Sequence, residues 1–325
     1  MIVLSNDDIA ALLPMAEAIE VIDAVMRGVS RGGAEMPLRN VVPVGGRNMM
    51  GVMPGALRGP DCYGVKLVSL FPDNPARGLS GHRGAMVLFE AETGGAVAMM
   101  DAGLLTALRT AAASAVATRA LARTDAQRLA IIGTGEQAVH HLEAMLCVRP
   151  IRCVHVAGRD ADKAADFARR ARQRHPQLAI DSGTDVRTAV AGADIVCTVT
   201  NAATPVLHGR WLEDGMHLNI VGASIPAKRE IDDDAVLKAR IFVDYRPSAL
   251  AQAGELVEMI AAGRIAETAL QAEIGAVLEG DAGGRATPRE VTLYRSLGVV
   301  AQDLAAAQHA LARAESEGRG QRVSF

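Results

Sequence analysis

A glycine-rich turn constrains the fold of this 325-residue chain more than any other feature of its sequence. The turn lies in the segment Leu129-Ala-Ile-Ile-Gly133-Thr134-Gly135-Glu136-Gln137-Ala138, which has the spacing G-x-G-x-x-A. Gly133 permits a tight turn, Gly135 lets a pyrophosphate approach the backbone, and Ala138 allows a helix to pack closely on a strand. Since the N-terminus of such a helix presents unpaired N–H groups, the segment favours binding of a nucleotide's phosphates.

From residue 127 onward, strand-like and helix-like segments alternate, which is the context that the turn requires. This alternation indicates βαβ units and a parallel sheet rather than an ordinary strand-to-helix turn. The expected strands are 128–132, 153–157, 178–181, 195–200, 217–221 and 240–244, and the clearest helices are 137–147 and 161–175. A last long helix is expected from about residue 288 to 315, followed by a loose tail over 318–325.

The N-terminal part of the chain follows a different pattern. Capping residues after Ser5 predict a helix through Leu13, and a second helix is expected over 15–29. From about residue 37 to 98, short β-like runs alternate with Gly and Pro clusters, which predicts a mostly antiparallel sheet. An Ala-rich helix is expected over 102–123. The whole pattern is that of an α/β protein.

Composition narrows the function. The chain has 34 basic and 37 acidic residues, and the basic ones are scattered, which argues against binding to nucleic acid. Four cysteines without a C-x-x-C pair predict reduced, mostly buried thiols, with neither disulfides nor a metal site. We expect no signal peptide, because the N-terminus has no basic region and reaches acidic residues early, and no apolar run reaches the roughly 18–20 residues of a membrane span. We therefore expect a soluble cytoplasmic protein that does not bind membranes.

The end of the second strand in the alternating region bears on the choice between NAD and NADP. The sequence there is Cys153-Val-His-Val-Ala-Gly158-Arg159-Asp160. A carboxylate at this position binds the ribose diol of NAD, whereas an arginine suits the phosphate of NADP. Gly158 takes the place of the acid and Arg159 follows it, which favours NADP, while Asp160 keeps NAD open. A solvated loop charge is the alternative role for Arg159.

Three cations in the N-terminal part of the chain are candidates for chemistry. Lys66 interrupts an apolar strand, and a buried lysine is costly unless it is paired or functional. Burial also lowers the pKa of a lysine, so that it can exchange a proton with an amine or imine. Arg109, in the Ala-rich helix, and Arg39 are candidates for binding a carboxylate. Taken singly, each of the three could equally be a structural residue.

Short motifs are spread along nearly the whole chain. Besides the glycine turn they are Pro37-Leu-Arg39, Gly64-Val-Lys66, Asn74-Pro-Ala-Arg-Gly-Leu79, Leu88-Phe-Glu-Ala-Glu-Thr-Gly94, Leu105-Thr-Ala-Leu-Arg109-Thr110-Ala-Ala, Val221-Gly222-Ala223-Ser224-Ile-Pro226 and Tyr294-Arg-Ser-Leu-Gly298. In this combination the chain resembles the ornithine cyclodeaminase/mu-crystallin family. The resemblance implies a Rossmann-type doubly wound parallel sheet, over 124–288, inserted into a mixed α+β domain. That second domain, 1–123 plus 289–325, would bind substrate and form a homodimer.

The resemblance also implies roles for individual residues. Arg39 and Arg109 correspond to a carboxylate-binding pair, and Lys66 to the residue that contacts the reacting group and relays a proton, so these three are the expected catalytic residues. The expected substrate-binding residues are the same three with His82 and Ser224. The residues expected at the dinucleotide are Thr110, Gly133, Thr134, Gly135, Glu136, Gln137, Gly158, Arg159, Asp160, Thr198, Thr200, Asn201, Val221, Gly222 and Ala223.

One departure from the family pattern bears on the reaction. Cyclodeaminases have a catalytic aspartate at the position that aligns with Ser224, and a serine has no comparable basicity at neutral pH. We therefore expect NADH- or NADPH-dependent reduction of a small α-imino acid to the L-amino acid, or the reverse dehydrogenase reaction. The alternatives are ornithine or lysine cyclodeamination with recycled NAD, and mu-crystallin-like binding of NADP and a small ligand.

His82 and Arg83 bear on the substrate side chain. They lie between the Lys66 strand and the next one, in Leu79-Ser-Gly-His-Arg-Gly84. If this turn faces the substrate, the site has more positive charge than one carboxylate needs, which favours an imino-dicarboxylate such as iminosuccinate. A solvent-facing turn is the alternative, and it leaves monocarboxylate and cyclic pyrroline-type imines open.

Overall fold

A computed structural model describes residues 1–59 and 61–324 of the chain, without the side chain of residue 75. The chain forms two compact units. Unit 1 consists of Met1–Arg109 and Val299–Phe325, and unit 2 consists of Thr110–Gly298. Unit 2 is therefore inserted into the sequence of unit 1, as predicted. The units divide at 109/110 and 298/299, whereas the predicted functional domains, which stay a prediction, divide at 123/124 and 288/289.

Unit 1 is built on one sheet. Its strands are β1 (Ile2–Leu4), β2 (Ala34–Glu35), β3 (Asn40–Gly45), β4 (Asn48–Leu57), β5 (Cys62–Leu70), β6 (His82–Phe89), β7 (Ala96–Asp101) and β16 (Gln321–Arg322). The order is β16-β1-β7-β6-β5-β4-β2, with β3 paired to β4. Every described pair is antiparallel except β1 with β7. The predicted mostly antiparallel sheet is confirmed.

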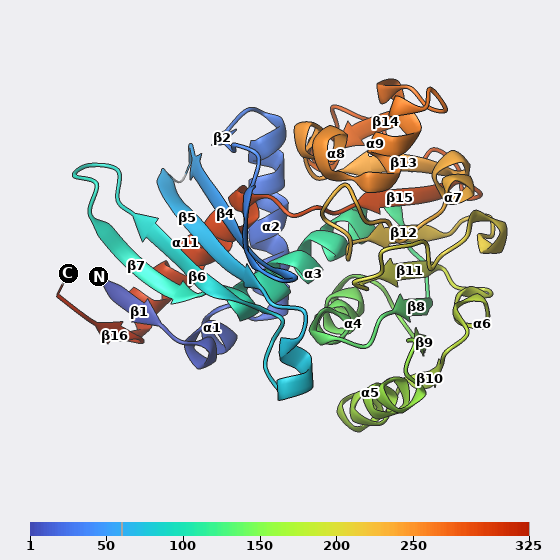
Figure 1. The fold of residues 1–325 in the computed structure, drawn as a ribbon, viewed down its shortest axis with the longest axis horizontal. Coiled ribbons are helices and arrows are strands. Elements are labelled where there is room, and N and C mark those ends of the chain that lie inside the picture. The colour runs from blue at the N-terminus through green and yellow to red at the C-terminus, as the bar shows by residue number, and fades with distance from the viewer. Residues whose placement is uncertain (60, 325) are drawn as a thin grey trace. The chain divides into compact units, whose positions relative to one another are not determined.

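Helices cover one face of this sheet. They are α1 (Asn6–Leu12), α2 (Met15–Ser30) and α11 (Val300–Glu317), and the first two confirm the predicted N-terminal helices. Helix α11 packs on β4, β5 and β6 and against α2, and Figure 1 shows it running behind the strands. Two glycines allow this close approach, because a Cβ on Gly64 would lie 3.2 Å from Leu304 and one on Gly55 only 2.5 Å from Val300. Side chains of β5 that face α11 are therefore deeply buried.

Unit 2 contains the predicted parallel sheet. Its strands are β8 (Arg128–Ile132), β9 (Cys153–Ala157), β10 (Ala179–Gly183), β11 (Ile195–Thr198), β12 (His217–Ile220), β13 (Ala239–Val243), β14 (Leu270–Glu273) and β15 (Val291–Arg295). The order is β10-β9-β8-β11-β12-β15-β13-β14, and every described pair is parallel. From β8 the chain therefore winds first through β9 and β10 and then returns to β11 on the other side. This reversal defines a doubly wound sheet.

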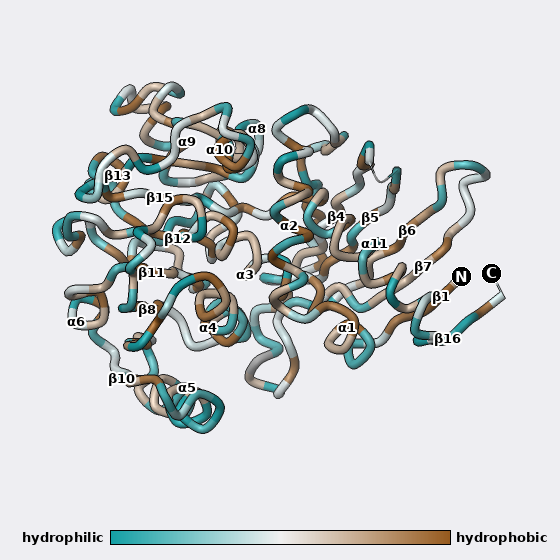
Figure 2. Tube along the Cα trace, turned by 180° about the vertical axis from the view of Figure 1, so that it is seen from behind, coloured by the Kyte–Doolittle hydropathy of each residue, from teal (hydrophilic) through white to brown (hydrophobic). Residues whose placement is uncertain are grey.

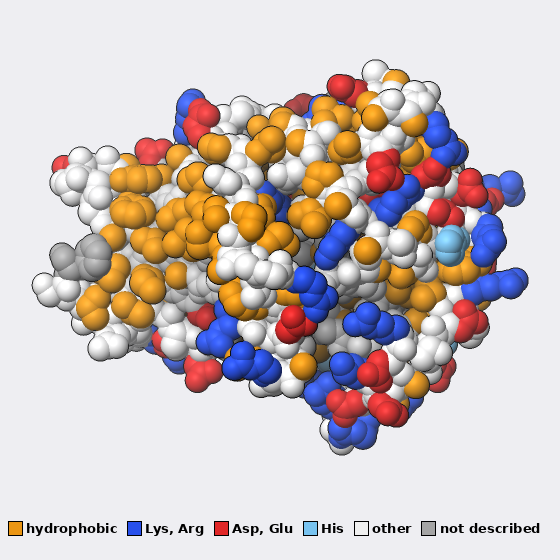
Figure 3. All heavy atoms as spheres, viewed as in Figure 1, with side chains coloured by type: hydrophobic (Ala, Val, Ile, Leu, Met, Phe, Trp, Pro, Cys, Tyr) orange, Lys and Arg blue, Asp and Glu red, His pale blue; other side chains and the backbone are white. Residues whose placement is uncertain are grey.

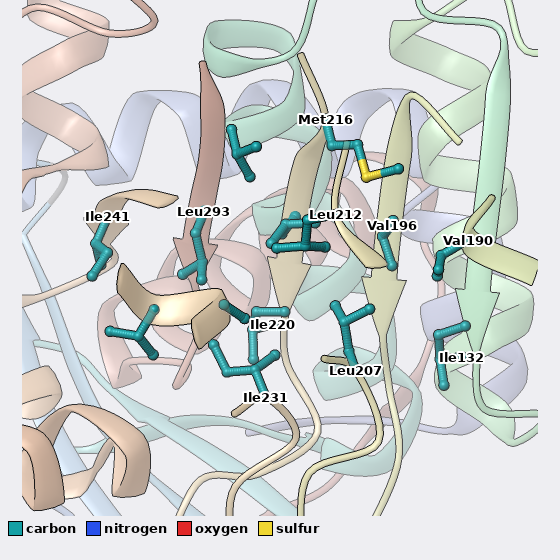
Figure 4. Close-up of a cluster of buried hydrophobic side chains, with 14 of the residues drawn as sticks. Ile132, Val190, Val196, Leu207, Leu212, Met216, Ile220, Ile231, Ile241 and Leu293 are labelled. Carbon is teal, nitrogen blue, oxygen red and sulfur yellow. The ribbon is translucent and has the colours of Figure 1, made fainter. Parts of the chain in front are cut away.

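The helices of unit 2 connect these strands. Helix α3 (Ala102–Leu121) leads from unit 1 into unit 2, and the others are α4 (Glu136–Val148), α5 (Ala161–Arg174), α6 (Val186–Val190), α7 (Asp233–Lys238), α8 (Arg246–Gln252), α9 (Gly254–Ala261) and α10 (Ile274–Glu279). Helix α5 is hydrophilic along most of its length and buries one face built around Phe167 (Figure 2). Aliphatic side chains from β8, β11, β12, β13 and β15 form the core (Figure 4).

Two expectations about the C-terminal part of the chain were wrong. The last helix begins at Val300 rather than near residue 288, because residues 291–295 form the buried central strand β15 and Gly298 interrupts the backbone at φ +75°. The tail over 318–325 was expected to be loose, but Gln321 and Arg322 pair with β1. Phe325 lies outside the described residues.

All four cysteines are free, as predicted, but only Cys62 and Cys197 are buried. Cys153 is half-buried, and Cys147 is exposed, so the expectation of mostly buried thiols holds for half of them. Within the described part of the chain, no helix has both the length and the apolar character to cross a membrane.

Candidate functional site

A buried ionic cluster lies in unit 1. Lys66 is 2% exposed, and its Nζ donates a hydrogen bond of 2.7 Å to Oδ2 of Asp303 on α11. Arg109, which is 5% exposed, donates from Nε to Oδ1 of the same carboxylate at 2.8 Å. Arg109 Nη1 also donates to Gln302 Oε1 at 3.0 Å. One carboxylate thus joins the lysine and the arginine that the sequence singled out.

The local structure explains why these side chains meet. Strand pairing sets Lys66 opposite Met53 of β4 and Met86 of β6, so that all three side chains face the same side of the sheet, beneath α11. Arg109 lies two turns into α3, whose first turn is capped by Asp101 at 3.1 Å. Since α11 packs directly on β5, Asp303 reaches Lys66 from the opposite layer.

Burial and charge change the pKa values of the cluster. Burial, together with the positive charge of Arg109, lowers the pKa of Lys66 to about 7, although Asp303 opposes this shift. Burial alone would raise the pKa of Asp303, but the charges of Arg109 and Lys66 outweigh it and hold that pKa below its usual value. The cluster therefore pairs an ionised carboxylate with a lysine that gains or loses a proton near neutral pH.

The other predicted substrate residues of unit 1 lie at different distances from the cluster. Arg39 precedes β3 and is near enough for its charge to lower the pKa of Lys66. His82 begins β6 and is exposed. It shares the face of Met86 but lies four residues, or about 13 Å, farther along the strand. Arg83 is exposed and points to the opposite face. The structure therefore brings Arg39, but neither His82 nor Arg83, toward Lys66.

The glycine turn of unit 2 has the geometry that a phosphate site requires. Gly133 follows β8 with φ +125°, and a Cβ there would lie 2.8 Å from Val199 O, so no other residue fits. Gly135 has open space where a side chain would stand, with no atom within 4 Å of a Cβ. Helix α4 begins directly after it, and Ala138 is fully buried against the sheet. The residues present therefore fit the pyrophosphate of a dinucleotide.

The sheet order places this turn at the point where the winding direction reverses. Strands β9 and β11 lie on opposite sides of β8, so the crevice outside the carboxyl ends of β8 and β11 is where doubly wound sheets bind ligands. Among the predicted cofactor residues, Thr198 ends β11 at this edge and Thr200 and Asn201 follow it, while Val221, Gly222 and Ala223 follow β12. Ser224 comes next in the same loop and is half-buried, while Thr110 is buried on α3.

The end of β9 carries the residues expected to select the coenzyme. A Cβ on Gly158 would lie 2.7 Å from Thr134 Cγ2, so a carboxylate-bearing residue does not fit there without movement of that methyl group. Arg159 is exposed. Asp160 caps α5 by accepting a hydrogen bond of 3.1 Å from Lys163 N. Asp160, the one acidic residue here that could favour NAD, therefore already serves as the cap of α5.

Sequence reasoning missed Asp303, Gln302 and Glu230. Asp303 interrupts an Ala-rich apolar helix face, which is the signal that could have identified it. Glu230 carried no such signal, because it follows two basic residues and looks like part of an exposed loop. Its carboxylate is fully buried and accepts hydrogen bonds from Thr198 and Thr200, so these hydroxyls point to Glu230.

Fold and site together define a dinucleotide-binding α/β protein with a buried cationic site in its other unit. Residues 1–318 match the sequence profile of the ornithine cyclodeaminase/mu-crystallin family. The chain belongs to this family, as the motifs predicted.

Solved structures with different substrates resemble the chain closely. Delta(1)-pyrroline-2-carboxylate reductase of Thermococcus litoralis, in complex with NADH and L-proline, is 33% identical with a TM-score of 0.96, covering 99% of this chain and 100% of that one. An archaeal alanine dehydrogenase dimer with bound NAD is 31% identical with a TM-score of 0.93, covering 100% and 99%. The iminosuccinate reductase of Paracoccus denitrificans, in complex with NAD+, is 31% identical with a TM-score of 0.90 and the same coverage.

Proposed function

We propose that this protein is an NAD(P)H-dependent oxidoreductase that reduces a small α-imino acid to the L-amino acid, or catalyses the reverse reaction. The similar structures are two imine reductases and an amino-acid dehydrogenase, each described with a nicotinamide dinucleotide or its reduced form. All three reactions interconvert a C=N bond and a CH–N bond next to a carboxylate. The glycine turn of unit 2 supports binding of the coenzyme.

The observation that carries this proposal is the charge of the buried cluster. While Lys66 is protonated, below its pKa of about 7, Lys66 and Arg109 bring two positive charges against the single negative charge of Asp303. A buried net charge is costly in the absence of a counter-ion, so the cluster favours an anionic ligand. Arg109 and Arg39 would bind the carboxylate of an imino acid, because guanidinium groups match its two oxygens.

Lys66 supplies the proton chemistry in this mechanism. Its ammonium group donates a proton to the imine nitrogen and is left as a neutral amine, and the resulting iminium carbon is electrophilic. Asp303 holds Lys66 and Arg109 in a fixed geometry, so that little reorganisation is needed during the reaction. A nicotinamide coenzyme, when bound at the turn of unit 2, supplies the hydride.

A spectrophotometric screen at 340 nm tests the proposed function. NADH and NADPH are offered with cyclic imino acids, and with pyruvate, glyoxylate or oxaloacetate plus ammonia or methylamine. Imine-dependent loss of absorbance is the expected result. Ammonia release from ornithine without net absorbance change would instead identify a cyclodeaminase, which Ser224 in place of an aspartate disfavours. Coenzyme binding without turnover of any imine would indicate a binding protein.

The same screen also tests which side chain the substrate carries. Structures of similar TM-score act on pyrroline-2-carboxylate, alanine and iminosuccinate, so fold similarity does not choose among them. The exposed position of His82, about 13 Å along β6 from the residue opposite Lys66, disfavours a second carboxylate site close to the cluster. We therefore expect a monocarboxylate or cyclic imine to react faster than oxaloacetate with ammonia.

We propose NADP(H) as the preferred coenzyme. Gly158 leaves no acid at the end of β9, Asp160 caps α5, and the exposed Arg159 is free to approach a 2′-phosphate. Comparing KM values for NADPH and NADH tests this preference. Replacing Arg159 with alanine should raise KM for NADPH about tenfold and leave KM for NADH unchanged, whereas an equal effect on both coenzymes would contradict it.

The outer face of the unit 1 sheet supports a homodimer. Val65 and Leu67 alternate with the buried Lys66 and so point away from α11. Strand pairing aligns Val65 with Val87, and Val87 with Met99. Leu67 is 37% and Met99 42% exposed, and Figure 3 shows hydrophobic side chains gathered over these strands. We propose that a second copy covers this face, as the dimeric state of the similar alanine dehydrogenase supports.

A further inference from the structure

One buried carboxylate holds two loops together at the carboxyl edge of the unit 2 sheet. Glu230 Oε1 accepts hydrogen bonds of 2.7 Å from both the N–H and the hydroxyl of Thr200. Oε2 accepts from the Thr198 hydroxyl at 2.9 Å and from Gly222 N at 2.6 Å. Thr198 and Thr200 belong to the end of β11 and its loop, and Gly222 belongs to the loop after β12. Glu230 therefore bridges both loops.

The two loops are in direct contact at this point. A Cβ on Gly222 would lie 1.9 Å from Thr200 O and 2.7 Å from Glu230 Oε1. Only a glycine lets the loop after β12 approach this closely. The positions of the two loops are therefore coupled, and Glu230 determines their spacing.

Arg295 holds the same loop from the end of β15. Its Nη1 donates to Ile220 O at 3.2 Å, and its Nη2 donates to Ala223 O. Its Nε pairs with the carboxylate of Glu255 on α9. The backbone from Ile220 to Ala223 is therefore bound at its N–H side by a carboxylate and at its C=O side by a guanidinium.

Burying these charged groups costs more free energy than holding two loops together requires. Glu230, Arg295 and Glu255 are all fully buried, and burying charged groups is unfavourable unless each is fully hydrogen-bonded. Hydrophobic side chains would stabilise two loops at lower cost. Buried charge networks of this kind are typical of sites whose geometry must be fixed.

We infer that Glu230 is a positioning residue for the dinucleotide, which fixes the backbone of 198–201 and 221–223 in its binding conformation. The inference rests on the proposed function, since these loops lie at the switch point beside the glycine turn. Thr198 and Thr200 then act through Glu230, and their hydroxyls do not bind the coenzyme directly. Arg295, anchored by Glu255, is the counterpart of Glu230 on the carbonyl side of the loop.

Coenzyme binding to Glu230→Gln tests the inference. The amide offers one oxygen where the carboxylate offers two, so one backbone N–H, of Thr200 or Gly222, loses its acceptor. We expect the Kd for NADPH and NADH, measured by fluorescence titration of the purified protein, to rise about tenfold or more. KM for the coenzyme should rise in parallel, while KM for the imine changes little.

A matched control lies at the opposite edge of the same strand. Asp194, directly before β11, accepts hydrogen bonds from Gln127 N at 2.8 Å and Arg128 N at 2.9 Å. Replacing Asp194 with asparagine removes a comparable carboxylate far from the carboxyl ends of the strands. Its Tm should fall, but its coenzyme Kd should stay within twofold of wild type.

A second variant keeps the inference testable if Glu230→Gln does not fold. Thr198→Val preserves side-chain shape and removes one hydrogen bond to Glu230, so the coenzyme Kd should rise about 2–10-fold. Unchanged coenzyme affinity in the folded variants, with only a lower Tm, would overturn the inference and leave the proposed function standing. Wild-type protein that binds neither coenzyme would overturn both.

Discussion

At the scale of single residues, Lys66 gives the proposed reaction its pH dependence. Burial lowers the pKa of Lys66 to about 7, and the protonated form is the one that can donate a proton to the imine nitrogen. We expect kcat/KM for imine reduction to be level below pH 7 and to fall about tenfold per pH unit above it. Lys66→Met should lower kcat/KM about 100–10,000-fold and remove this limb of the profile.

The profile is measured as loss of absorbance at 340 nm between pH 5.5 and 9. Lys163→Met is the matched control, since Lys163 is an exposed residue of α5 and its removal should leave both rate and profile unchanged. A Lys66→Met enzyme that keeps the wild-type rate would contradict the proton-donating role of this lysine.

Replacing Asp303 should change both the pH dependence of the reaction and the stability of the fold. Asp303 raises the pKa of Lys66, so Asp303→Asn should move the fall in kcat/KM to lower pH. The same change leaves two buried cations without a counter-charge, which should reduce the free energy of unfolding by about 3–5 kcal/mol. Asp166→Asn, at an exposed ion pair, should cost less than about 1 kcal/mol in urea denaturation. If the pH profile of kcat/KM for Asp303→Asn coincides with that of wild type, the Asp303 carboxylate does not influence the proton transfer.

At the scale of elements, the two glycines between β8 and α4 should respond differently to the same substitution. Gly133→Ala forces a side chain against Val199 O at φ +125°, so we expect a large fall in Tm. Gly135→Ala meets no atom within 4 Å, so the fold should keep its Tm. The added methyl group stands where a pyrophosphate would approach, and the coenzyme Kd should rise tenfold or more. Thermal melts with coenzyme titrations check both variants, and tight binding by Gly135→Ala would contradict a phosphate site here.

Elements with local signals could be predicted from the sequence, and those that depend on distant partners could not. The strand, turn and helix around Gly133 were predictable because apolar periodicity and glycine spacing lie within ten residues. Strand β15 was not, because it forms by inserting between β12 and β13, and its short apolar run lies close before helix α11 in the sequence. Asp303 has a local signal, as an acid on an apolar helix face, but its pairing with Lys66 could not be predicted, since the two lie 237 residues apart in the sequence.

At the scale of the whole molecule, the outer face of the unit 1 sheet supports the proposed homodimer. Its inner face packs under α11, yet its outer face carries a continuous row of apolar side chains through Val65, Val87 and Met99. A sheet that is hydrophobic on both faces is buried on both faces in most folded proteins. Helices of unit 1 cover only the inner one among the described residues, so the outer face is where a second protomer should bind.

Charge placed on this outer face should therefore separate the protomers. We expect the wild-type chain to elute as a homodimer in size-exclusion chromatography with light scattering, and Leu67→Arg to elute as a monomer, because a buried arginine would lack a counter-charge in the interface. Leu237→Arg is the matched control: Leu237 is 54% exposed on α7 of unit 2, and this variant should stay dimeric. A monomeric wild type, or a Leu67→Arg variant that dimerises as tightly as wild type, would show that this face has another partner.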